Sequence, residues 1–442
     1  MAISLVHYSR VDSNCFDDLK ISLFDLTHSG QESYWFAVSN GKDLKHAKGN
    51  GIIDLTSSYD LSGFAGIGSN SPKPHAEPAI SYSRKLKNFA LALEGYIING
   101  NDLREKYGGR TDPELCARFI ADAGDFVNGV KNLVNEAKGY YNIFVLTEKG
   151  ETYGFRCPLG IRPIIFGKGD KGYAVVSESR ALFHIDMELE KDVEAGEIFG
   201  IDGSGIHTIE KLENKKHVCS FLWPYYQMPD SITEGISIYC IKKRIGEVLG
   251  KIDKETGLEI DLVTYVPDSG KFFEEGYAEV FGCEHRRILT KYQYAGRSYE
   301  RPEQKYRDLI AGVKLTVIPY EAKNKKIVLF DDSIRRGTQI IREGGPIDLL
   351  KRSGVEEIHL RLGSPRNIKY CRFAQPDGDR YKDEELAANR FKTDEDMAKY
   401  LGIKSVRFIG IDDFVKCIIE GSKLRRENLC LGCYTGDFGF ID

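Results

Sequence analysis

Residues 326–340 constrain the fold of this chain more than any other segment, and they read K-I-V-L-F-D-D-S-I-R-R-G-T-Q-I. The apolar start of the segment, residues 327–330, is typical of a strand that is buried on both faces of a parallel sheet. Such sheets bind ligands just beyond the carboxyl ends of their strands, where Asp331 and Asp332 follow. The segment therefore predicts an α/β sheet with a binding site at this strand end, and it predicts that both carboxylates face solvent.

The loop after the two carboxylates has the composition of a phosphate-binding turn. Gly337 lets a ligand approach the backbone closely, Thr338 adds a hydroxyl donor, and the N–H groups of residues 336–339 can turn inward onto a phosphate. A ribose 5-phosphate fits both halves, with its 2- and 3-hydroxyls on Asp331 and Asp332 and its phosphate on the loop. The alternative is a strand, turn and helix whose acidic residues only cap the helix, but a cap requires one carboxylate and no R-G-T turn.

Length and composition limit the class of protein. A chain of 442 residues exceeds what one hydrophobic core usually accommodates, so we expect two domains. The net charge of −4, with 29% charged and 41% hydrophobic residues, lacks the basic excess of a nucleic-acid-binding protein. No apolar run is long enough to span a membrane, and the first residues lack the layout of a signal peptide, so we predict a cytoplasmic location. The ten cysteines suit that compartment if they are reduced or bound to metal.

The hydrophobic pattern changes near the middle of the chain. Up to Thr233, short apolar strands and polar turns surround one amphipathic stretch at residues 113–134, which suits stacked antiparallel sheets covered by helices. From Glu234 onward, apolar strands alternate with helical patterns, which indicates a doubly wound parallel sheet. We predict domains at residues 1–233 and 234–442, with strands of the second domain at residues 261–266, 327–330, 357–362 and 405–409.

The 326–340 segment resembles the 5-phosphoribosyl 1-pyrophosphate (PRPP) motif of type I phosphoribosyltransferases. The chain as a whole resembles the iron–sulfur branch of the amidophosphoribosyltransferases, which begin purine synthesis. That resemblance implies an α+β N-terminal-nucleophile (αββα) glutaminase-like domain followed by an α/β type I phosphoribosyltransferase domain with a parallel sheet. The other motifs that carry it are T-H-S-G-Q-E at 27–32, C-P-L-G-I-R-P at 157–163, V-S-E-S at 176–179, V-E-A-G-E-I at 193–198, V-P-D-S-G at 266–270, K-Y-Q-Y-A-G-R-S-Y at 291–299 and C-L-G-C-Y-T-G-D at 430–437.

The resemblance fails at the residues that hydrolyse glutamine in this family. Those enzymes use an N-terminal cysteine, whereas this sequence opens Met-Ala-Ile-Ser, so removal of methionine would expose Ala2. The family's H-x-R-Y, which binds the glutamine carboxylate, is replaced by S-N-S-P at residues 69–72. The oxyanion-hole H-N-G-N is replaced by L-E-G-Y, with Glu94 in place of an amide donor. We therefore expect no glutaminase activity, and we expect structural roles for His28 and Asp112, which match family positions.

The residues for PRPP chemistry are mostly present. Displacing pyrophosphate from C1 of PRPP builds negative charge on the leaving group, which requires Mg²⁺ and cations above the sugar. By resemblance, Lys291, Tyr294 and Arg297 belong to the loop that closes over the pyrophosphate, and Lys314 is a basic residue that follows it. A solvated charged loop is the alternative. The resemblance assigns PRPP binding to Asp331, Asp332, Ser333, Arg336, Gly337 and Thr338, and Mg²⁺ to Asp331, Asp332 and Ser269.

Four of the cysteines match the cluster ligands of the iron–sulfur branch. Cys430 and Cys433 form a C-x-x-C near the C-terminus, and Cys219 and Cys371 come from distant segments. Four thiolates suit a tetrahedral zinc ion or a cubane cluster equally well by geometry, and buried free cysteines are the remaining alternative. The resemblance favours a 4Fe–4S cluster that ties the segment near Cys219 to the end of the chain as a structural staple.

Together, the residues and the resemblance predict a PRPP-dependent phosphoribosyltransferase that cannot use glutamine and that transfers the phosphoribosyl group to ammonia or another amine. We expect a homo-oligomer with no nucleic-acid or membrane partner. Two hypotheses of other classes remain, namely a non-catalytic regulator that binds PRPP and a structural partner protein whose glutaminase-like half docks another enzyme. Turnover separates the enzyme from the regulator, and PRPP binding separates the regulator from the structural partner.

Overall fold

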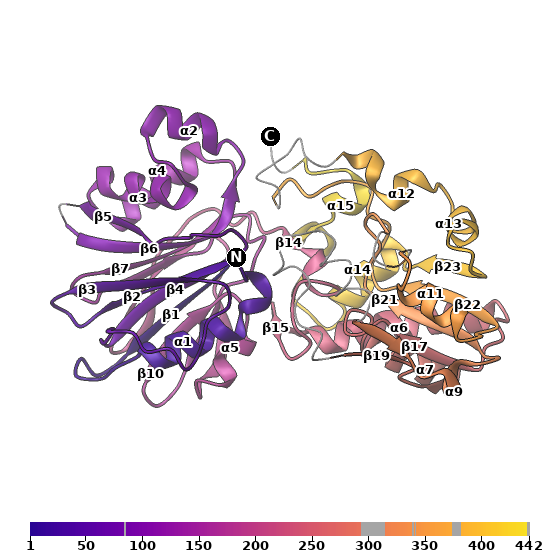
Figure 1. Ribbon diagram of the computed structural model, residues 1–442. Helices are drawn as coiled ribbons and strands as arrows, with labels where there is room; N and C mark the ends of the chain where they lie inside the picture. Colours follow the sequence, from indigo (N-terminus) through magenta and orange to yellow (C-terminus); the bar gives the residue numbers. More distant parts are fainter. Residues whose placement is uncertain (84, 293–313, 338–339, 341, 374–381, 440–442) are drawn as a thin grey trace.

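The computed structural model describes the chain except for residues 84, 293–313, 338–339, 341, 374–381 and 440–442. The described residues form two units side by side, an antiparallel sandwich from the N-terminal half and a unit with a parallel sheet from the C-terminal half (Figure 1). Among the helices that the structure describes, none combines the length and the apolar character that crossing a membrane requires.

Two antiparallel sheets form the first unit. One contains β1 (Ala2–Tyr8), β2 (Ser33–Ser39), β3 (Leu44–Asn50), β4 (Ala65–Ser71), β9 (Ile165–Lys168), β10 (Gly172–Val176) and β11 (Glu188–Asp192), in the order β11-β9-β10-β1-β4-β2-β3. The other contains β5 (Ala79–Ser83), β6 (Lys87–Ile97), β7 (Gly139–Thr147), β8 (Thr152–Phe155), β12 (Glu197–Asp202) and β13 (Gly205–Lys211), in the order β13-β12-β8-β7-β6-β5. The two sheets share a core in which Phe36, Phe144 and Phe199 are fully buried, as expected for sheets that pack face to face.

Helices cover both outer faces of this sandwich, which confirms the four-layer αββα arrangement (Figure 1). On one side α1 (Phe16–Asp25) packs on β1 and β4 and contacts α5 (Arg180–Phe183). On the other side α3 (Asp112–Ala123) packs on β5 and β6, beside α2 (Gly100–Tyr107) and α4 (Phe126–Glu136). The single amphipathic stretch predicted at residues 113–134 is thus two helices, because Gly124 ends α3 at φ 79° and Asp125 caps α4.

A five-stranded parallel sheet forms the centre of the second unit, as predicted. Its strands are β17 (Leu262–Tyr265), β18 (Glu284–His285), β21 (Lys326–Asp331), β22 (Glu357–Leu362) and β23 (Ser405–Phe408), in the order β18-β17-β21-β22-β23. All neighbouring strands run parallel. β21 is central and residues 327–330 are fully buried, so the chain leaves the core at Asp331.

Helices pack around this sheet, and two of them approach each other unusually closely. A side chain at Gly246 of α6 would meet the carbonyl oxygen of Phe273 at 1.8 Å, and one at Gly276 of α7 would meet that of Lys243 at 2.0 Å. Asp253 anchors α6 to β22, because its carboxylate accepts hydrogen bonds from Arg361 at 2.5 and 3.1 Å. The helices are α6 (Ile238–Glu255), α7 (Phe273–Phe281), α9 (Pro319–Ala322), α11 (Pro346–Arg352), α12 (Ala387–Arg390), α13 (Asp394–Leu401), α14 (Ile411–Ile419) and α15 (Gly432–Thr435).

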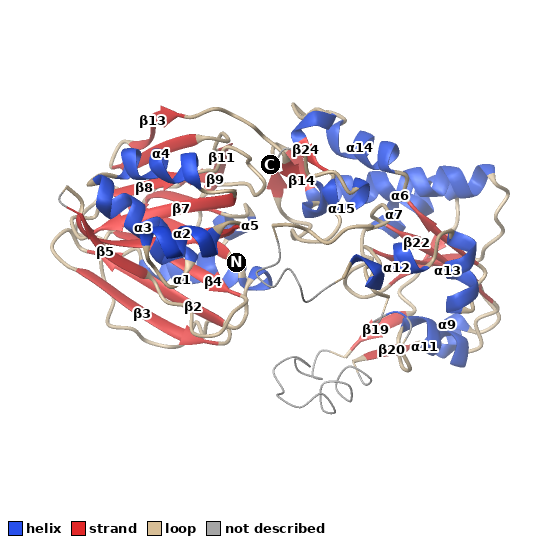
Figure 2. Ribbon diagram, turned by 90° about the horizontal axis from the view of Figure 1, so that it is seen from above, coloured by secondary structure: helices blue, strands red, loops and turns tan. Residues whose placement is uncertain are grey.

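A short parallel ribbon between the two units joins distant parts of the chain. β14 (Val218–Cys219) pairs with β24 (Leu429–Cys430), and both lie between the sandwich and the parallel sheet in Figure 2. Phe221, Leu222 and Trp223, which follow β14, pack into the core of the second unit. The linking segment is therefore held by the second unit, while the exact domain boundary at residues 233 and 234 stays a prediction. Two further ribbons pair β15 (Ile232–Thr233) with β16 (Ile236–Ser237), and β19 (Leu289–Lys291) with β20 (Leu315–Val317).

Candidate functional site

Asp331 and Asp332 lie at the carboxyl end of the central strand β21. Ser269 Oγ donates a 2.5 Å hydrogen bond to Asp331 Oδ1, and the backbone N–H of Asp332 donates to the same oxygen at 2.9 Å. Ser333 Oγ donates to Asp332 Oδ1 at 2.8 Å. The loops that follow β17 and β21 thus meet at one edge of the sheet, where ligands of parallel sheets bind.

This acidic pair is more enclosed than the sequence predicted. Asp332 is only 7% exposed and Asp331 is partly buried, so the prediction that both carboxylates face solvent was wrong. The loop of Ser269 and the α6 residue Lys242 pack around the strand end, and the order of residues along the chain does not reveal such a contact. Burial raises the pKa of both carboxyls, and repulsion by Asp331 adds to the rise at Asp332.

Lys242 is a component of this site that the sequence analysis missed. The side chain is 5% exposed, and its Nζ lies 5.3 Å from the centroid of the Phe273 ring. Burial lowers the pKa of Lys242, while the negative charges of Asp332, Glu274 and Asp331 oppose that effect. The site therefore contains a buried cation beside its buried carboxylates.

A sequence signal for Lys242 exists in the pattern of α6. The lysine lies on the buried face of an amphipathic helix, where a charged residue is rare unless it is paired. A lysine in the middle of such an apolar repeat therefore indicates a candidate site residue. The apolar residues that share its face are Ile238, Ile241, Ile245 and Leu249.

The structure brings one end of the predicted closing loop to the acidic pair. Lys291 ends β19, and its Nζ lies 2.8 Å from Asp268 Oδ2, next to Ser269. Lys314 lies across the same ribbon, where its carbonyl oxygen accepts a hydrogen bond from Tyr292 at 2.8 Å. Lys291 thus joins the site through Asp268, whereas the predicted loop residues Tyr294 and Arg297 lie outside the described residues.

The predicted phosphate loop is described only in part. Gly337 has φ 79°, in the left-handed region that glycine adopts without strain and that other residues rarely adopt. Arg336 Nη1 lies 3.5 Å from Glu385 Oε2, so its guanidinium pairs with the segment before α12. Thr338 lies outside the described residues. The described half of the loop fits the predicted close approach of a ligand to the backbone.

A separate cavity of about 1630 Å³ lies beside the glutaminase-like unit, and Cys371 and Phe373 of the second unit also line it. Its walls include Met1, His28, Ser71, Arg162 and Cys219, so it extends from the edge of the sandwich to the β14 segment. The Arg162 guanidinium lies 4.3 Å from the centroid of the Tyr226 ring, over its face. Ser71 on this wall is one of the residues that replace the family's glutamine-carboxylate motif.

Glu94 lies on β6 in this region and is 3% exposed. Its Oε2 accepts hydrogen bonds from Asn142 Nδ2 and Ser177 Oγ, both at 3.2 Å. Burial raises the pKa of the Glu94 carboxyl, and the positive charge of Arg162 opposes that rise. Glu94 thus accepts two hydrogen bonds at the position where the resemblance puts an oxyanion-hole donor.

His28 and Asp112 both make contacts that hold the fold. His28 Nε2 lies 2.7 Å from Glu178 Oε2, and the other oxygen of Glu178 accepts from Ser231 Oγ at 2.6 Å. Asp112 accepts a hydrogen bond from the backbone N–H of Ile97 at 3.2 Å and also pairs with Arg104. These contacts support the structural roles expected for both residues.

The four matched cysteines come together between the two units. Cys219 and Cys430 are register partners in the β14–β24 ribbon, and the carbonyl oxygen of Cys433 accepts hydrogen bonds from residues 368 and 369, just before Cys371. Burial raises the pKa of the Cys433 thiol, and the charges of the other three cysteines add to that rise. None of the ten cysteines, all of them described residues, forms a disulfide. The tertiary structure thus gathers thiols from three separate segments.

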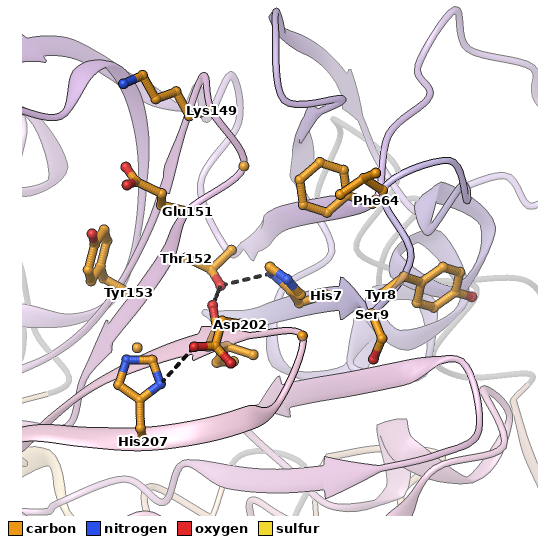
Figure 3. Close-up of a pocket in the computed structure, with 15 residues that line it drawn as sticks. His7, Tyr8, Ser9, Phe64, Lys149, Glu151, Thr152, Tyr153, Asp202 and His207 are labelled. Carbon is orange, nitrogen blue, oxygen red and sulfur yellow. Dashed lines mark hydrogen bonds and ion pairs between the residues drawn. The ribbon is translucent and has the colours of Figure 1, made fainter.

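A smaller hollow of about 330 Å³ lies at the other end of the sandwich, where β1 ends (Figure 3). His7 Nδ1 lies 3.1 Å from Thr152 Oγ1, and His207 Nδ1 lies 3.7 Å from Asp202 Oδ2. Burial lowers the pKa of His7 to about 4. None of the predicted site residues lines this hollow, and the polar groups just named pair with one another, so we do not assign it to the candidate site.

The fold and the acidic strand end define a class of protein in which an N-terminal-nucleophile-type sandwich is joined to a type I phosphoribosyltransferase sheet. No family model matches the chain. The chain is 30% identical to the amidophosphoribosyltransferase of Methanocaldococcus jannaschii, over 98% of this chain and 96% of that protein. It is 29% identical to the Bacillus subtilis protein of the same name, over 94% of this chain and 90% of that protein.

A solved structure agrees with these relatives. The glutamine PRPP amidotransferase of B. subtilis, complexed with ADP and GMP, superposes with a TM-score of 0.85 and 27% identity, covering 99% of this chain and 97% of that chain. The chain belongs to the amidophosphoribosyltransferase family.

Proposed function

We propose that this protein is a PRPP-dependent phosphoribosyltransferase of the amidophosphoribosyltransferase type, which transfers the phosphoribosyl group to ammonia or another amine and does not use glutamine. The observation that carries the proposal is the enclosed acidic pair at the end of β21, which Ser269 fixes and which a loop with a left-handed Gly337 follows. The names of the relatives and of the solved structure support the phosphoribosyl chemistry.

The arrangement of side chains suits this reaction. Asp331 and Asp332 can accept hydrogen bonds from the ribose hydroxyls and so fix the sugar. The nitrogen lone pair of the acceptor then forms a bond to C1, the bond from C1 to the pyrophosphate oxygen breaks, and a proton leaves the nitrogen. Lys291, held beside Asp268, supplies positive charge near the departing pyrophosphate.

Mg²⁺ would bind together with PRPP. Among the residues that the structure describes, no three or more His, Cys, Asp or Glu side chains form a compact metal-binding group. Mg²⁺ typically takes one or two carboxylates plus substrate phosphates and keeps several waters, so the oxygens of Asp331, Asp332 and Ser269 suit it only as a partial ligand set. The metal would neutralise charge on the leaving group.

The glutaminase-like unit supports the second part of the proposal. Glu94 is a buried hydrogen-bond acceptor at the predicted oxyanion position, and loss of one oxyanion donor already costs about a hundredfold or more in rate. Ser71 ends β4 on the cavity wall, where its Oγ accepts a hydrogen bond from the N–H of Lys73 at 3.0 Å. A serine in this turn cannot replace the paired charge that arginine offers a carboxylate. These two features support the proposed loss of glutamine hydrolysis.

A 4Fe–4S cluster is our proposed cofactor for the cysteine group. Around one zinc ion, four thiolates lie about 3.8 Å apart, since each Zn–S bond is about 2.3 Å long. The described thiols form no such compact group, although Cys433 is within electrostatic reach of Cys219, Cys371 and Cys430. Four thiolates suit a zinc ion or a cubane equally well by geometry, and the resemblance to the iron–sulfur branch of the family favours the cubane. Bound there, it would hold the β14–β24 ribbon to the segment of Cys371.

The test is a screen for pyrophosphate release from PRPP and Mg²⁺ with glutamine, ammonium salts and a panel of amines. We expect release with ammonia or an amine and none with glutamine above the background without an acceptor. PRPP binding without turnover for any acceptor would instead indicate a regulator. Absence of PRPP binding would leave only the structural-partner hypothesis.

A further inference from the structure

Four ionisable side chains lie buried or partly buried around the end of β21. Lys242 is 5% exposed, Glu274 is 3% exposed and Asp332 is 7% exposed, with Asp331 partly buried beside them. Three carboxyl groups and one lysine side chain thus share a small, largely buried region. Buried charges are costly unless they are paired, so the arrangement needs a physical explanation.

Lys242 makes no hydrogen bond and no ion pair within 4 Å with the residues that the structure describes, although Asp332, Glu274 and Asp331 all act on its charge. The ammonium lies over the face of the Phe273 ring, and Phe273 is the residue next to Glu274. The four-carbon stem of lysine is flexible. The ammonium is thus held near two sets of carboxylates without being bound to either.

Glu274, like Lys242, is buried and has a polar atom without a hydrogen-bond partner in the described part of the chain. Its Oε2 is buried and has no hydrogen-bond partner among the described residues. Burial raises the pKa of the carboxyl to about 7, and repulsion by Glu275 adds to that rise. Lys271 also acts on Glu274, but its Nζ lies over the Phe272 ring at 4.5 Å. A buried, unpartnered carboxylate oxygen marks a place where a cation or a donor is missing.

The helices that carry the two residues are fixed at close range. Gly246 of α6 and Gly276 of α7 leave room for only backbone contact, since any added side chain would collide with a carbonyl oxygen of the other helix. α6 and α7 therefore cannot separate or slide without loss of this contact. Movement of the Lys242 side chain between the acidic pair and Glu274 requires no movement of either helix.

We propose that Lys242 is a further positioning residue of the phosphoribosyl site, an inference that rests on the proposed function. While the site is empty, its ammonium neutralises Asp331 and Asp332; when a Mg²⁺-bound sugar phosphate occupies that pair, the ammonium moves to the carboxylate of Glu274. The incoming metal repels the ammonium, and the unpartnered Oε2 of Glu274 receives it. The binding free energy of the ligand thus includes formation of one buried ion pair.

The first test compares the wild type with Glu274→Gln, Lys242→Met and the double variant. In Glu274→Gln the ammonium loses its charged second partner, so the Kd for Mg²⁺–PRPP and the KM for PRPP should rise about tenfold, which is the effect of losing a charged hydrogen bond. The kcat at saturating PRPP should change less than about twofold, because the acceptor chemistry is untouched. Glu274→Gln in the Lys242→Met background should cause no further loss, because the ammonium is already absent.

Glu275→Gln is the matched control. Glu275 is the neighbour of Glu274 on α7, but its carboxylate accepts a hydrogen bond from Tyr239 at 2.8 Å, and we expect wild-type PRPP binding from that variant. An equal effect of Glu274→Gln with and without Lys242 would overturn the proposal, as would wild-type affinity in Glu274→Gln.

A second arm needs no PRPP and separates this inference from the proposed function. Lys242→Met should lower the thermal midpoint of the ligand-free protein, because Asp331 and Asp332 lose their counter-charge. Adding Asp332→Asn should restore most of that loss by removing one of the two repelling charges. If Asp332→Asn restores nothing, Lys242 does not neutralise the pair and the inference fails. If the wild type does not bind PRPP but this restoration occurs, the proposed function fails and only the charge pairing stands.

Discussion

Ser269 Oγ lies 2.5 Å from Asp331 Oδ1, and this hydrogen bond joins the loop after β17 to the end of β21. The same Asp331 oxygen accepts the N–H of Asp332, so the orientation of the acidic pair depends on a serine that is distant in sequence. Lys291 contacts Asp268, the neighbour of Ser269. The loop after β17 therefore positions both the carboxyl groups and the Lys291 side chain of the proposed PRPP site.

Asp331→Asn combined with Asp332→Asn should abolish PRPP binding and leave the fold intact. An amide carries no charge, so the variant loses its contacts to the ribose hydroxyls and to Mg²⁺. The fold should remain, because the substitutions remove two carboxyl groups that repel each other. Calorimetry with PRPP and Mg²⁺ measures the loss, and circular dichroism checks the fold. Asp261→Asn is the control, because Asp261 accepts the N–H of Lys326 at the opposite end of β21. Retained PRPP affinity in the double variant would falsify the assignment of the pair.

Gly337→Val should also remove PRPP binding. Gly337 has φ 79°, which a β-branched residue adopts only with strain, and a side chain there stands where the phosphate must approach. Gly257→Val provides the comparison, since Gly257 has φ 69° with no atom within 4 Å of an added Cβ. We expect both variants to lose some thermal stability, but only Gly337→Val to lose affinity in a PRPP titration. Equal PRPP affinity in the two variants would argue against a phosphate site at this loop.

Glutamine should not be hydrolysed. Glu94 is a buried acceptor and Ser71 lacks a charge for the substrate carboxylate, so one substitution alone cannot supply both missing functions. We expect Glu94→Asn and Ser71→Arg, made singly, to remain without glutamate production in a coupled assay. Boiled protein gives the background. Glutamate formation by the wild type above that background contradicts the prediction.

Anaerobically purified protein should be brown and contain about four iron and four sulfide per chain if the cysteines hold a cubane. Cys433→Ser should lose the colour and lower the thermal midpoint, because a metal centre that binds only the folded state adds its binding free energy to folding. Cys240→Ser is the control, because Cys240 is exposed on α6. Elemental analysis decides the outcome, and a colourless protein with one zinc per chain would replace the cluster by a tetrahedral zinc site.

The stability gain from Glu274→Gln should depend on pH. The folded protein keeps a proton on Glu274 up to about pH 7, whereas the unfolded chain releases it near pH 4.3. Between these values the folded state binds more protons, so the wild-type free energy of unfolding falls as pH rises and stays lower above pH 7. Glu274→Gln removes this effect and should be more stable than the wild type at pH 8 by on the order of 1–3 kcal/mol.

Urea denaturation at pH 4 and pH 8 measures this gain, which should be much smaller at pH 4, where Glu274 is protonated in the folded state and mostly protonated in the unfolded chain. Glu275→Gln, whose neighbour Tyr239 donates to it, should show no comparable pH-dependent gain. A stability difference of the same size at both pH values would mean that the Glu274 carboxyl is not the titrating group.

The sequence alone determined the local elements and the class of fold. The predicted strand at residues 357–362 matches β22 at both ends, and the buried run at residues 327–330 lies inside β21. Hydrophobic periodicity reports which residues of a short segment are buried, and adjacent polar residues then locate the strand end. The same signal missed the break at Gly124, because an apolar face continues from α3 into α4.

Only the tertiary structure decided which distant side chains meet. The enclosure of Asp332, the placement of Lys242 among three carboxylates and the gathering of Cys219, Cys371, Cys430 and Cys433 all depend on segments that are far apart in the chain. Burial and electrostatic pairing arise from how α6, α7 and the sheet pack, and no local pattern encodes that packing. Sequence motifs therefore identified the proposed PRPP site, whereas only the packing of α6 against the sheet showed that Lys242 lies near Asp331 and Asp332.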